Sequence, residues 1–361
     1  MAAHLKPLVS SWRPDDTTVI AVVESRGAAM PYTLVAVPAA GGPATPLISV
    51  AVSAPGDIDL RRDGSALVAS IPLAYSPTIT SRLAVWDLRT GALRWITPED
   101  DGVDTRRPRW SADGAFVNYS RVRWPASGAA AQPPDLGVFR VRADGSDARR
   151  IHDPAPTGKV GAPEAVTDDG VLLWWLMSAG SEGATLEAFD LTSGRERSTG
   201  QCARFMSWRS ARPRALLETA VCAVGPDLRS VALWDDVAGA LTVLTPKEDT
   251  RGADWDLSGT RVVVALRSGS GPYGLATMDT AGGARTRLVG TDNARDPRWL
   301  RAGIAYLWSN AEHHAAAAGD AGDFWSFTAP YEVRLTPPAG GSATTLYRTD
   351  DTIVEIRFVR P

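Results

Sequence analysis

The sequence predicts an all-β protein, a seven-bladed β-propeller in which each blade is a four-stranded antiparallel sheet. Three observations support this prediction. A short phrase of turn and strand residues recurs along the chain, at spacings of 43 to 55 residues. Each copy contains enough apolar runs for four short strands. No stretch shows the 3.6-residue period of an amphipathic helix. The repeats are anchored at Trp12, Asp59, Trp110, Ala165, Trp208, Trp255 and Trp299.

The clearest copy begins at Trp110 and shows the expected order of elements. Ser111-Ala112-Asp113-Gly114 precedes an apolar run, and a second pair of strands follows around Ala143-Asp144-Gly145. Asp-Gly supplies the positive φ that a two-residue hairpin turn requires. A unit of four short strands cannot bury both of its faces alone, whereas radial packing of several units buries the faces and protects the edges. We therefore expect one ring-shaped domain spanning residues 1–361.

The repeat divides this domain into seven blades and a closing segment. We expect blades at residues 7–48, 55–97, 104–151, 161–199, 203–245, 251–289 and 294–348. Residues 352–359 form one further strand, which we expect to pair near His4–Val9 and close the ring. An incomplete eighth blade is the alternative. The five repeat tryptophans, Trp12, Trp110, Trp208, Trp255 and Trp299, are expected at equivalent buried positions between blades.

The Trp-Ser-x-Asp-Gly element at Trp110, with Asp-x-x-x-Gly turns such as Asp87–Gly91, resembles the repeat of TolB-type propellers. The same repeat occurs in the propeller domain of prolyl oligopeptidase-family enzymes, and the resemblance covers roughly Pro7–Arg348. It implies the fold and says little about function, because these motifs are turn and packing signals. Unlike TolB itself, the sequence shows no additional domain before the first blade. It also contains no G-x-S-x-G nucleophile elbow or hydrolase domain, so peptidase activity is not implied.

Composition excludes several functional classes. The chain has 38 basic and 41 acidic residues, and no Lys/Arg-rich run indicates a nucleic-acid partner. No stretch approaches eighteen consecutive apolar residues, so we expect no membrane span. No secretory signal is evident, which favours a cytoplasmic location. Cys202 and Cys222 show no metal-binding or redox spacing, and we expect two reduced, unrelated thiols.

Function is expected on the rim that carries the loops between second and third strands. Three of these loops are long, at residues 70–80, 120–136 and 309–330, and they could cover the channel mouth as a mobile lid. The residues that end the second strands should point toward this mouth. They are Glu24, Ser70, Arg121, Ser178, Glu218, Arg267 and Trp308.

This ring mixes carboxylates with guanidinium groups. Arginine offers a bidentate fork for carboxylate or phosphate groups, and a glutamate in a closed funnel could act as a general acid or base. We assign catalytic roles to Glu24, Glu218 and His313. We assign substrate binding to Arg121, Arg123, Trp124, Arg267, Trp308, Asn310 and Trp325. The alternative is that the charged residues are solvated and pair with each other.

His313-His314 is the one adjacent histidine pair in the sequence. Neighbouring side chains on an extended strand point in opposite directions, so the pair is not expected to hold a metal. We expect neither a metal nor another cofactor. A solvent-exposed pair without a chemical role is the alternative for these histidines.

Two functional hypotheses remain open. The first is a small-molecule-binding propeller, a class that includes a cofactorless acid–base enzyme of the lyase, cyclase or hydrolase type, which works in the central funnel. The second is a non-catalytic scaffold whose partner is another protein. The long loops at three blades favour the first hypothesis, because they suggest a covered pocket.

Overall fold

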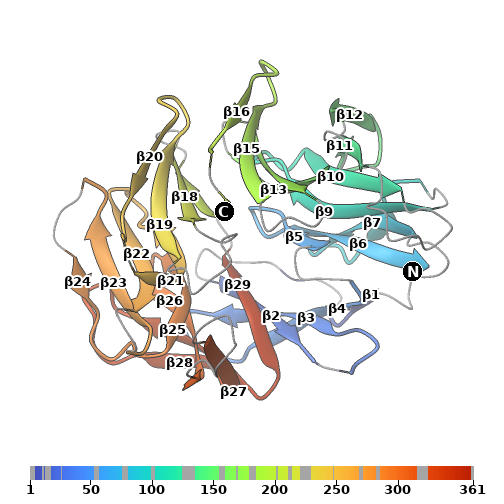
Figure 1. Cartoon of the computed structure of the whole chain (residues 1–361). Helices are drawn as coiled ribbons and strands as arrows, with labels where there is room; N and C mark the ends of the chain where they lie inside the picture. Colours follow the sequence, from blue (N-terminus) through green and yellow to red (C-terminus); the bar gives the residue numbers. More distant parts are fainter. Residues whose placement is uncertain are drawn as a thin grey trace.

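The computed structural model describes residues 5–9, 12, 18–25, 27–52, 57–74, 80–98, 102–123, 135–153, 159–167, 170–178, 184–200, 202–209, 214–219, 229–246, 248–267, 271–281, 285–314 and 324–358. This part of the chain contains twenty-nine β-strands and no α-helix. The strands form seven antiparallel sheets arranged as the blades of a propeller (Figure 1). The predicted fold class is therefore confirmed.

The strands follow one another in blade order along the chain. Blade 1 comprises β1 (Leu5–Pro7), β2 (Thr18–Glu24), β3 (Tyr32–Pro38), β4 (Thr45–Val50) and β29 (Thr352–Phe358). Blade 2 comprises β5 (Ile58–Leu60), β6 (Ala66–Ala74), β7 (Thr80–Asp87) and β8 (Leu93–Trp95). Blade 3 comprises β9 (Val103–Trp110), β10 (Phe116–Arg123), β11 (Asp135–Arg142) and β12 (Arg149–His152). Blade 4 comprises β13 (Lys159–Val166), β14 (Val171–Ser178), β15 (Ala184–Asp190) and β16 (Glu196–Ser198).

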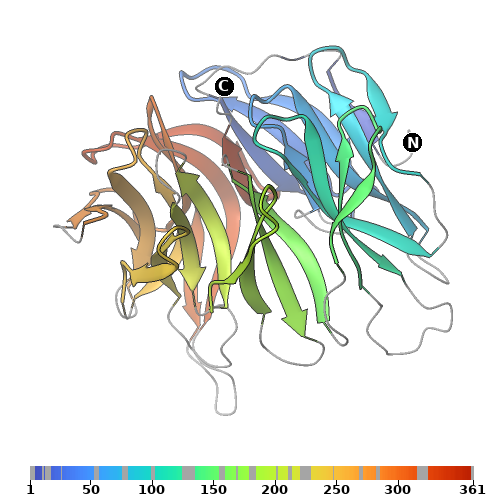
Figure 2. The ribbon, with the colours of Figure 1, turned by 90° about the horizontal axis from the view of Figure 1, so that it is seen from above.

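The remaining blades have the same arrangement. Blade 5 comprises β17 (Ala203–Arg209), β18 (Arg214–Thr219), β19 (Ser230–Asp235) and β20 (Ala240–Val243). Blade 6 comprises β21 (Asp249–Trp255), β22 (Arg261–Arg267), β23 (Gly274–Asp279) and β24 (Thr286–Arg287). Blade 7 comprises β25 (Ala294–Leu300), β26 (Gly303–His314), β27 (Phe324–Thr336) and β28 (Thr344–Thr349). Figure 2 shows neighbouring sheets lying face to face around the ring.

The Asp-Gly turns join first and second strands as the sequence predicts. In blade 3, Asp113 Oδ1 accepts hydrogen bonds from the Ser111 hydroxyl at 2.6 Å and from the Ala115 amide at 3.0 Å. Gly114 has a φ of 65°, a conformation that favours glycine over other residues. These bonds lower the pKa of Asp113. The turn sequence therefore determines where each hairpin reverses.

Four of the five repeat tryptophans occupy equivalent positions. Trp110, Trp208, Trp255 and Trp299 pair with the second residue of the following strand, in the same register in each blade. Trp110, Trp255 and Trp299 are buried, as predicted.

The prediction was wrong for Trp12, which precedes β2 and belongs to no strand. Its ring packs against the core shared by blades 1 and 2, and its amide donates to the Leu88 carbonyl at 2.6 Å. In blade 1 the repeat position is Phe358, which pairs with Val19.

Ring closure differs from the sequence expectation in its partner strand. β29 pairs with β2 and takes the place of the first strand of blade 1, while β1 pairs with β4 on the opposite edge of the sheet. The C-terminal segment therefore does not pair with His4–Val9, because three strands separate them. In Figure 1, β29 lies near the centre of the ring and the N-terminus lies at its outer side. The sheet still joins both chain ends, as a closed propeller requires.

Cys202 lies in the connection between blades 4 and 5 and is disulfide-bonded. The expectation of two reduced thiols was therefore wrong. The only other cysteine of the sequence is Cys222, which is outside the described residues. The sequence contains no C-x-x-C or other recognisable cysteine spacing that would predict this bond.

No helix in the described part of the chain is both long and apolar enough to span a membrane.

Candidate functional site

The rim that carries the loops is formed by the ends of the second strands, the starts of the third strands and the connections between blades. In blades 1, 4 and 6 the second strand ends where the sequence suggested, at Glu24, Ser178 and Arg267. In the other blades it continues past the expected residue, to Ala74, Arg123, Thr219 and His314. The seven expected residues are therefore not equivalent, because three of them end their strand and four lie before its end.

Strand register also divides these residues between two faces. Counted from the second residue of each second strand, Glu24, Ser70, Glu218 and Arg267 lie an odd number of residues along their strands. Arg121, Ser178 and Trp308 lie an even number along. Because side chains alternate between the two faces of a strand, the two groups face different neighbouring blades. Their position in the repeat does not by itself direct all seven into one mouth.

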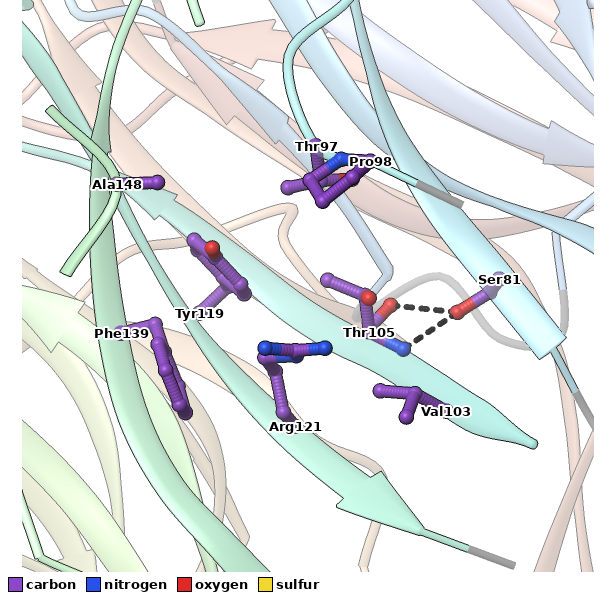
Figure 3. Close-up of a pocket in the computed structure, with 9 residues that line it drawn as sticks. All are labelled: Ser81, Thr97, Pro98, Val103, Thr105, Tyr119, Arg121, Phe139 and Ala148. Atoms are coloured by element: carbon purple, nitrogen blue, oxygen red, sulfur yellow. Dashed lines mark hydrogen bonds between the residues drawn. The ribbon is translucent and has the colours of Figure 1, made fainter. Parts of the chain in front are cut away.

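A pocket lies on this rim between blades 2 and 3 (Figure 3). It holds about 430 Å³ of space, part of which is open to solvent. Blade 2 and its connection to blade 3 contribute one wall, and blade 3 contributes the rest. The lining residues are Ser81, Thr97, Pro98, Val103, Thr105, Tyr119, Arg121, Phe139 and Ala148.

Arg121 is the charged residue of this pocket. Its Cζ atom lies 5.0 Å from the centroid of the Phe139 ring, a distance typical of cation–π contacts. Phe139 in turn stacks on Tyr119, with ring centroids 5.9 Å apart. Figure 3 shows the guanidinium group between the Phe139 ring and Thr105. The two rings therefore hold a planar cation at the centre of the pocket.

Burial gives Tyr119 a distinct character. Its side chain is only 3% exposed. Burial raises the pKa of Tyr119 to about 12, although the charge of Arg121 acts in the opposite direction. The phenol is therefore neutral throughout the physiological pH range, and it contributes a ring and a hydroxyl rather than a charge.

The opposite wall is fixed by hydrogen bonds between blades. Ser81 Oγ accepts from the Thr105 amide at 2.6 Å and lies 2.6 Å from Asp104 Oδ1, to which it donates. Asp104 is buried, and its other oxygen pairs with Arg106 Nε at 2.7 Å. Thr97 Oγ1 accepts from the Leu83 amide at 2.9 Å and so anchors the connection. This wall is rigid before any ligand arrives.

The lining determines what the pocket can do chemically. It combines one guanidinium group, several hydroxyls and two aromatic rings, and its nine lining residues include no carboxylate and no imidazole. A guanidinium group presents paired N–H donors to carboxylate or phosphate oxygens. The pocket is therefore suited to bind an anionic group that is attached to a planar or apolar body.

The predicted catalytic residues lie elsewhere. Glu24 pairs in register with Tyr32, whose pKa is raised by burial and by the neighbouring Glu24 carboxylate. Glu218 is buried, and Arg229 Nη1 lies 4.0 Å from its Oε2. His313 is part of β26 and pairs in register with Trp325. Residues 309–330 thus begin and end as a two-stranded arm, not as the irregular loop expected from sequence.

The predicted binding residues are also dispersed. Arg267 pairs with Asp249 in blade 6, with Nε 2.9 Å from Oδ2. Trp308 is covered by Arg334, whose Cζ lies 3.8 Å from the ring centroid. Asn310 Nδ2 donates to the Ala329 carbonyl at 2.9 Å. Arg123 is exposed at the end of β10, and Trp124 lies outside the described residues. Of the predicted site residues that the structure describes, Arg121 is the one that lines the pocket between blades 2 and 3.

Sequence reasoning missed most of the pocket. Tyr119 and Phe139 belong to regular strands and resemble core residues in the sequence, while Ser81 and Thr105 belong to strands of different blades. A weak signal was present in the alternation of Tyr119 and Arg121 on one strand face. No group of three or more possible metal ligands occurs among the described residues.

Neither a protein-family model nor a curated protein matches the chain. Solved structures show the fold. A prolyl endopeptidase aligns with a TM-score of 0.59 and 13% identity, over 99% of this chain and 50% of its own. A putative 6-phosphogluconolactonase from Bacteroides uniformis aligns with a TM-score of 0.53 and 13% identity, over 96% of this chain and 100% of its own. TolB from Acinetobacter baumannii aligns with a TM-score of 0.49 and 18% identity, over 80% of this chain and 68% of its own.

The chain thus spans about half the length of the prolyl endopeptidase that it resembles. The propeller fold is confirmed, and the likeness to the propeller of prolyl oligopeptidase-family proteins rests on the aligned prolyl endopeptidase. At these identities it carries no information about the ligand or the reaction.

Proposed function

We propose that this propeller binds a small organic anion in the pocket between blades 2 and 3. Arg121 would hold the carboxylate or phosphate group, and the Phe139 and Tyr119 rings would contact a planar or apolar part of the molecule. The observation that carries the proposal is the position of Arg121 over Phe139 inside a rim pocket. Stacking orients the planar guanidinium group before binding, which lowers the entropic cost of complex formation.

Binding is a better-supported role than catalysis. The lining residues contain no group that exchanges protons near neutral pH, and the carboxylate behind the wall, Asp104, is already paired with Arg106. An acid–base reaction would need a residue from another part of the rim, such as Glu24 or Glu218. We therefore propose a small-molecule-binding protein first and a cofactorless acid–base enzyme second.

The proposal is tested by isothermal titration calorimetry with benzoate and with benzyl alcohol, which has a similar ring and no charge. We expect the parent to bind benzoate and not benzyl alcohol. Arg121→Gln should weaken benzoate binding about 10- to 100-fold, since a hydrogen bond to a charged group contributes about 1.5–3 kcal/mol. Arg121→Lys keeps the charge but loses the fork, and it should give an intermediate loss.

Arg94→Gln is the matched control. Arg94 is exposed on the outer strand β8, so its replacement changes the net charge equally without touching the pocket. Equal benzoate affinity in the parent, Arg121→Gln and Arg94→Gln proteins would refute the proposed site. A parent that binds none of a panel of aromatic carboxylates and phosphates would favour the protein-scaffold hypothesis.

The cellular location is also a proposal. Cytoplasmic disulfides are uncommon because glutathione and thioredoxin keep thiols reduced. The disulfide at Cys202 therefore supports an oxidising compartment and weakens the cytoplasmic expectation drawn from the sequence. Trapping of free thiols with an alkylating reagent in intact source cells tests this placement. Full alkylation of Cys202 would contradict the oxidising compartment and support a cytoplasmic location.

A further inference from the structure

A second group of cations lies across the ring, where the first strands of blades 6 and 7 approach closely. At Gly252 the φ is 105°, and an added Cβ atom would lie 2.7 Å from the Cα atom of Asp296. Only glycine permits this approach. Arg251 precedes Gly252 on β21, and Arg295 precedes Asp296 on β25. The close backbone contact therefore brings the two arginines near each other.

Arg295 is poorly satisfied for a buried cation. Its side chain is 12% exposed. Its Nη2 donates to the Ile353 carbonyl at 3.3 Å, its Nη1 lies 3.8 Å from Asp296 Oδ2, and its buried Nε has no partner in the described part of the chain. An arginine has five N–H donors, and a buried donor without a partner is costly. The site therefore has unused donor capacity.

Arg251 is a second cation whose hydrogen-bond donors are only partly used. Its Nε donates to the Tyr273 hydroxyl at 3.2 Å, and within the described ranges it forms no ion pair with a carboxylate. The nearby Asp249 is already used, because it accepts from Tyr273 and pairs with Arg267 at 2.9 Å. Glu218 interacts with Arg251 only at longer range.

The electrostatics of the pair agree with this geometry. Burial lowers the pKa of Arg295, and the charge of Arg251 acts in the same direction, against the opposing effect of Asp296. The pKa of Arg251 is raised in spite of burial, because Tyr273, Asp249 and Glu218 lie near it. Arg295 is thus the cation whose charge is least compensated.

Aromatic rings surround the two guanidinium groups. The Cζ atom of Arg295 lies 4.8 Å from the Phe327 ring centroid and 5.8 Å from that of Tyr331. The Cζ atom of Arg251 lies 5.7 Å from the Tyr273 ring centroid. Tyr273 and Phe327 contact each other across the blade boundary, with centroids 6.2 Å apart. These rings shield the cations from water and strengthen their attraction for an anion.

We propose that Arg251 and Arg295 together bind one oxyanion, the carboxylate or phosphate group of a small molecule, at the boundary of blades 6 and 7. Two neighbouring buried cations repel each other unless a negative charge lies between them. An oxyanion supplies that charge and accepts hydrogen bonds from donors that are otherwise unused. This site is separate from the Arg121 pocket and does not depend on it.

The test measures the melting temperature at constant ionic strength in sodium chloride, sodium phosphate and sodium succinate. All proteins carry Arg121→Gln, so that the first pocket does not contribute. Phosphate or succinate should raise the Tm relative to chloride, by about 3–4 °C at a hundred times Kd for a chain of this length. The probe that gives the larger shift identifies the preferred oxyanion.

Arg295→Gln and Arg251→Gln, each added to this background, should abolish the oxyanion-specific shift, and the exposed control Arg94→Gln should retain it. If a glutamine variant does not fold, Arg295→Lys provides the second comparison, since it keeps the charge and loses the bidentate fork. The proposal is overturned if neither oxyanion raises the Tm above that in chloride. It is equally overturned if the shift persists in both glutamine variants.

Discussion

Shortening one side chain of the closing strand should destabilise the whole ring. Ile356 of β29 has no exposed surface and pairs in register with Ala21 of β2. Its side chain belongs to the core shared by blade 1 and blade 7, which includes Leu300 and Ala305. Replacing such a residue by alanine typically costs about 2–5 kcal/mol, because both the transfer energy and the packing are lost.

The expected change in melting temperature follows from chain length. An unfolding entropy of about 2.1 cal/mol/K per residue gives about 0.8 kcal/mol/K for this chain. Ile356→Ala should therefore lower the Tm by about 3–6 °C in differential scanning calorimetry. Val289→Ala is the control, because Val289 is 79% exposed and its replacement should leave the Tm within about 1 °C. An Ile356→Ala protein that melts with the parent would show that β29 does not close the ring.

Two further predictions concern covalent and ionic contacts. Reduction of the Cys202 disulfide with dithiothreitol should lower the Tm by several degrees, since loss of a native disulfide typically costs about 2–5 kcal/mol. An unchanged Tm in a protein that shows two titratable thiols would contradict this prediction. The folded-state pKa of Asp113 is lowered by its turn hydrogen bonds, so its stabilising contribution is present above the unfolded pKa and is lost as the pH falls through the folded one. Asp113→Ala should therefore show a smaller loss of Tm on acidification than the parent, and parallel pH profiles would refute the assignment.

Most of the fold could be predicted because the repeat consists of local signals. The Asp-Gly turns define the hairpins, and the tryptophan register defines how blades stack, as the common positions of Trp110, Trp208, Trp255 and Trp299 show. The prediction of the repeat position was wrong for blade 1, because the first strand of this blade comes from the other end of the chain. Trp12 stands where the repeat would place it in sequence, whereas Phe358 occupies the position in space. Local patterns contain no information on which distant segment completes a sheet.

The candidate site was harder to predict for a different reason. A pocket between blades combines residues from different repeats, and each of them looks ordinary within its own repeat. Phe139 and Tyr119 resemble strand core residues, yet they form the surface on which Arg121 rests. The expected ring residues also lie at unequal distances along their second strands, and a difference of one residue places a side chain on the opposite face of the sheet.

The residue that precedes the repeat position shows why charge alone does not identify function in this ring. In three blades it binds the next blade directly: Arg357 Nη1 donates to the Ile58 carbonyl at 2.8 Å, Arg109 Nε to the Glu164 carbonyl at 2.6 Å, and Ser207 Oγ to Asp254 Oδ1 at 2.6 Å. A cation and a hydroxyl thus meet the same structural requirement, because each donates a hydrogen bond to the neighbouring blade.

The Nε of Arg357 is also buried without a partner in the described part of the chain, but Arg357 Nη2 lies 3.0 Å from Glu355 Oε2. Arg295 differs from Arg357 in the distance to its carboxylate. Its Nε has no partner in the described part of the chain, and its nearest carboxylate lies 3.8 Å away. Blade-to-blade contact does not require a charge, as Ser207 shows, and a half-buried cation without a close carboxylate is the more costly choice. A cation that lowers the stability of the fold, at a position where an uncharged residue would fit, is best explained by a ligand that completes its hydrogen bonds. In this propeller, a cation without a close carboxylate is therefore a better guide to a binding site than charge alone.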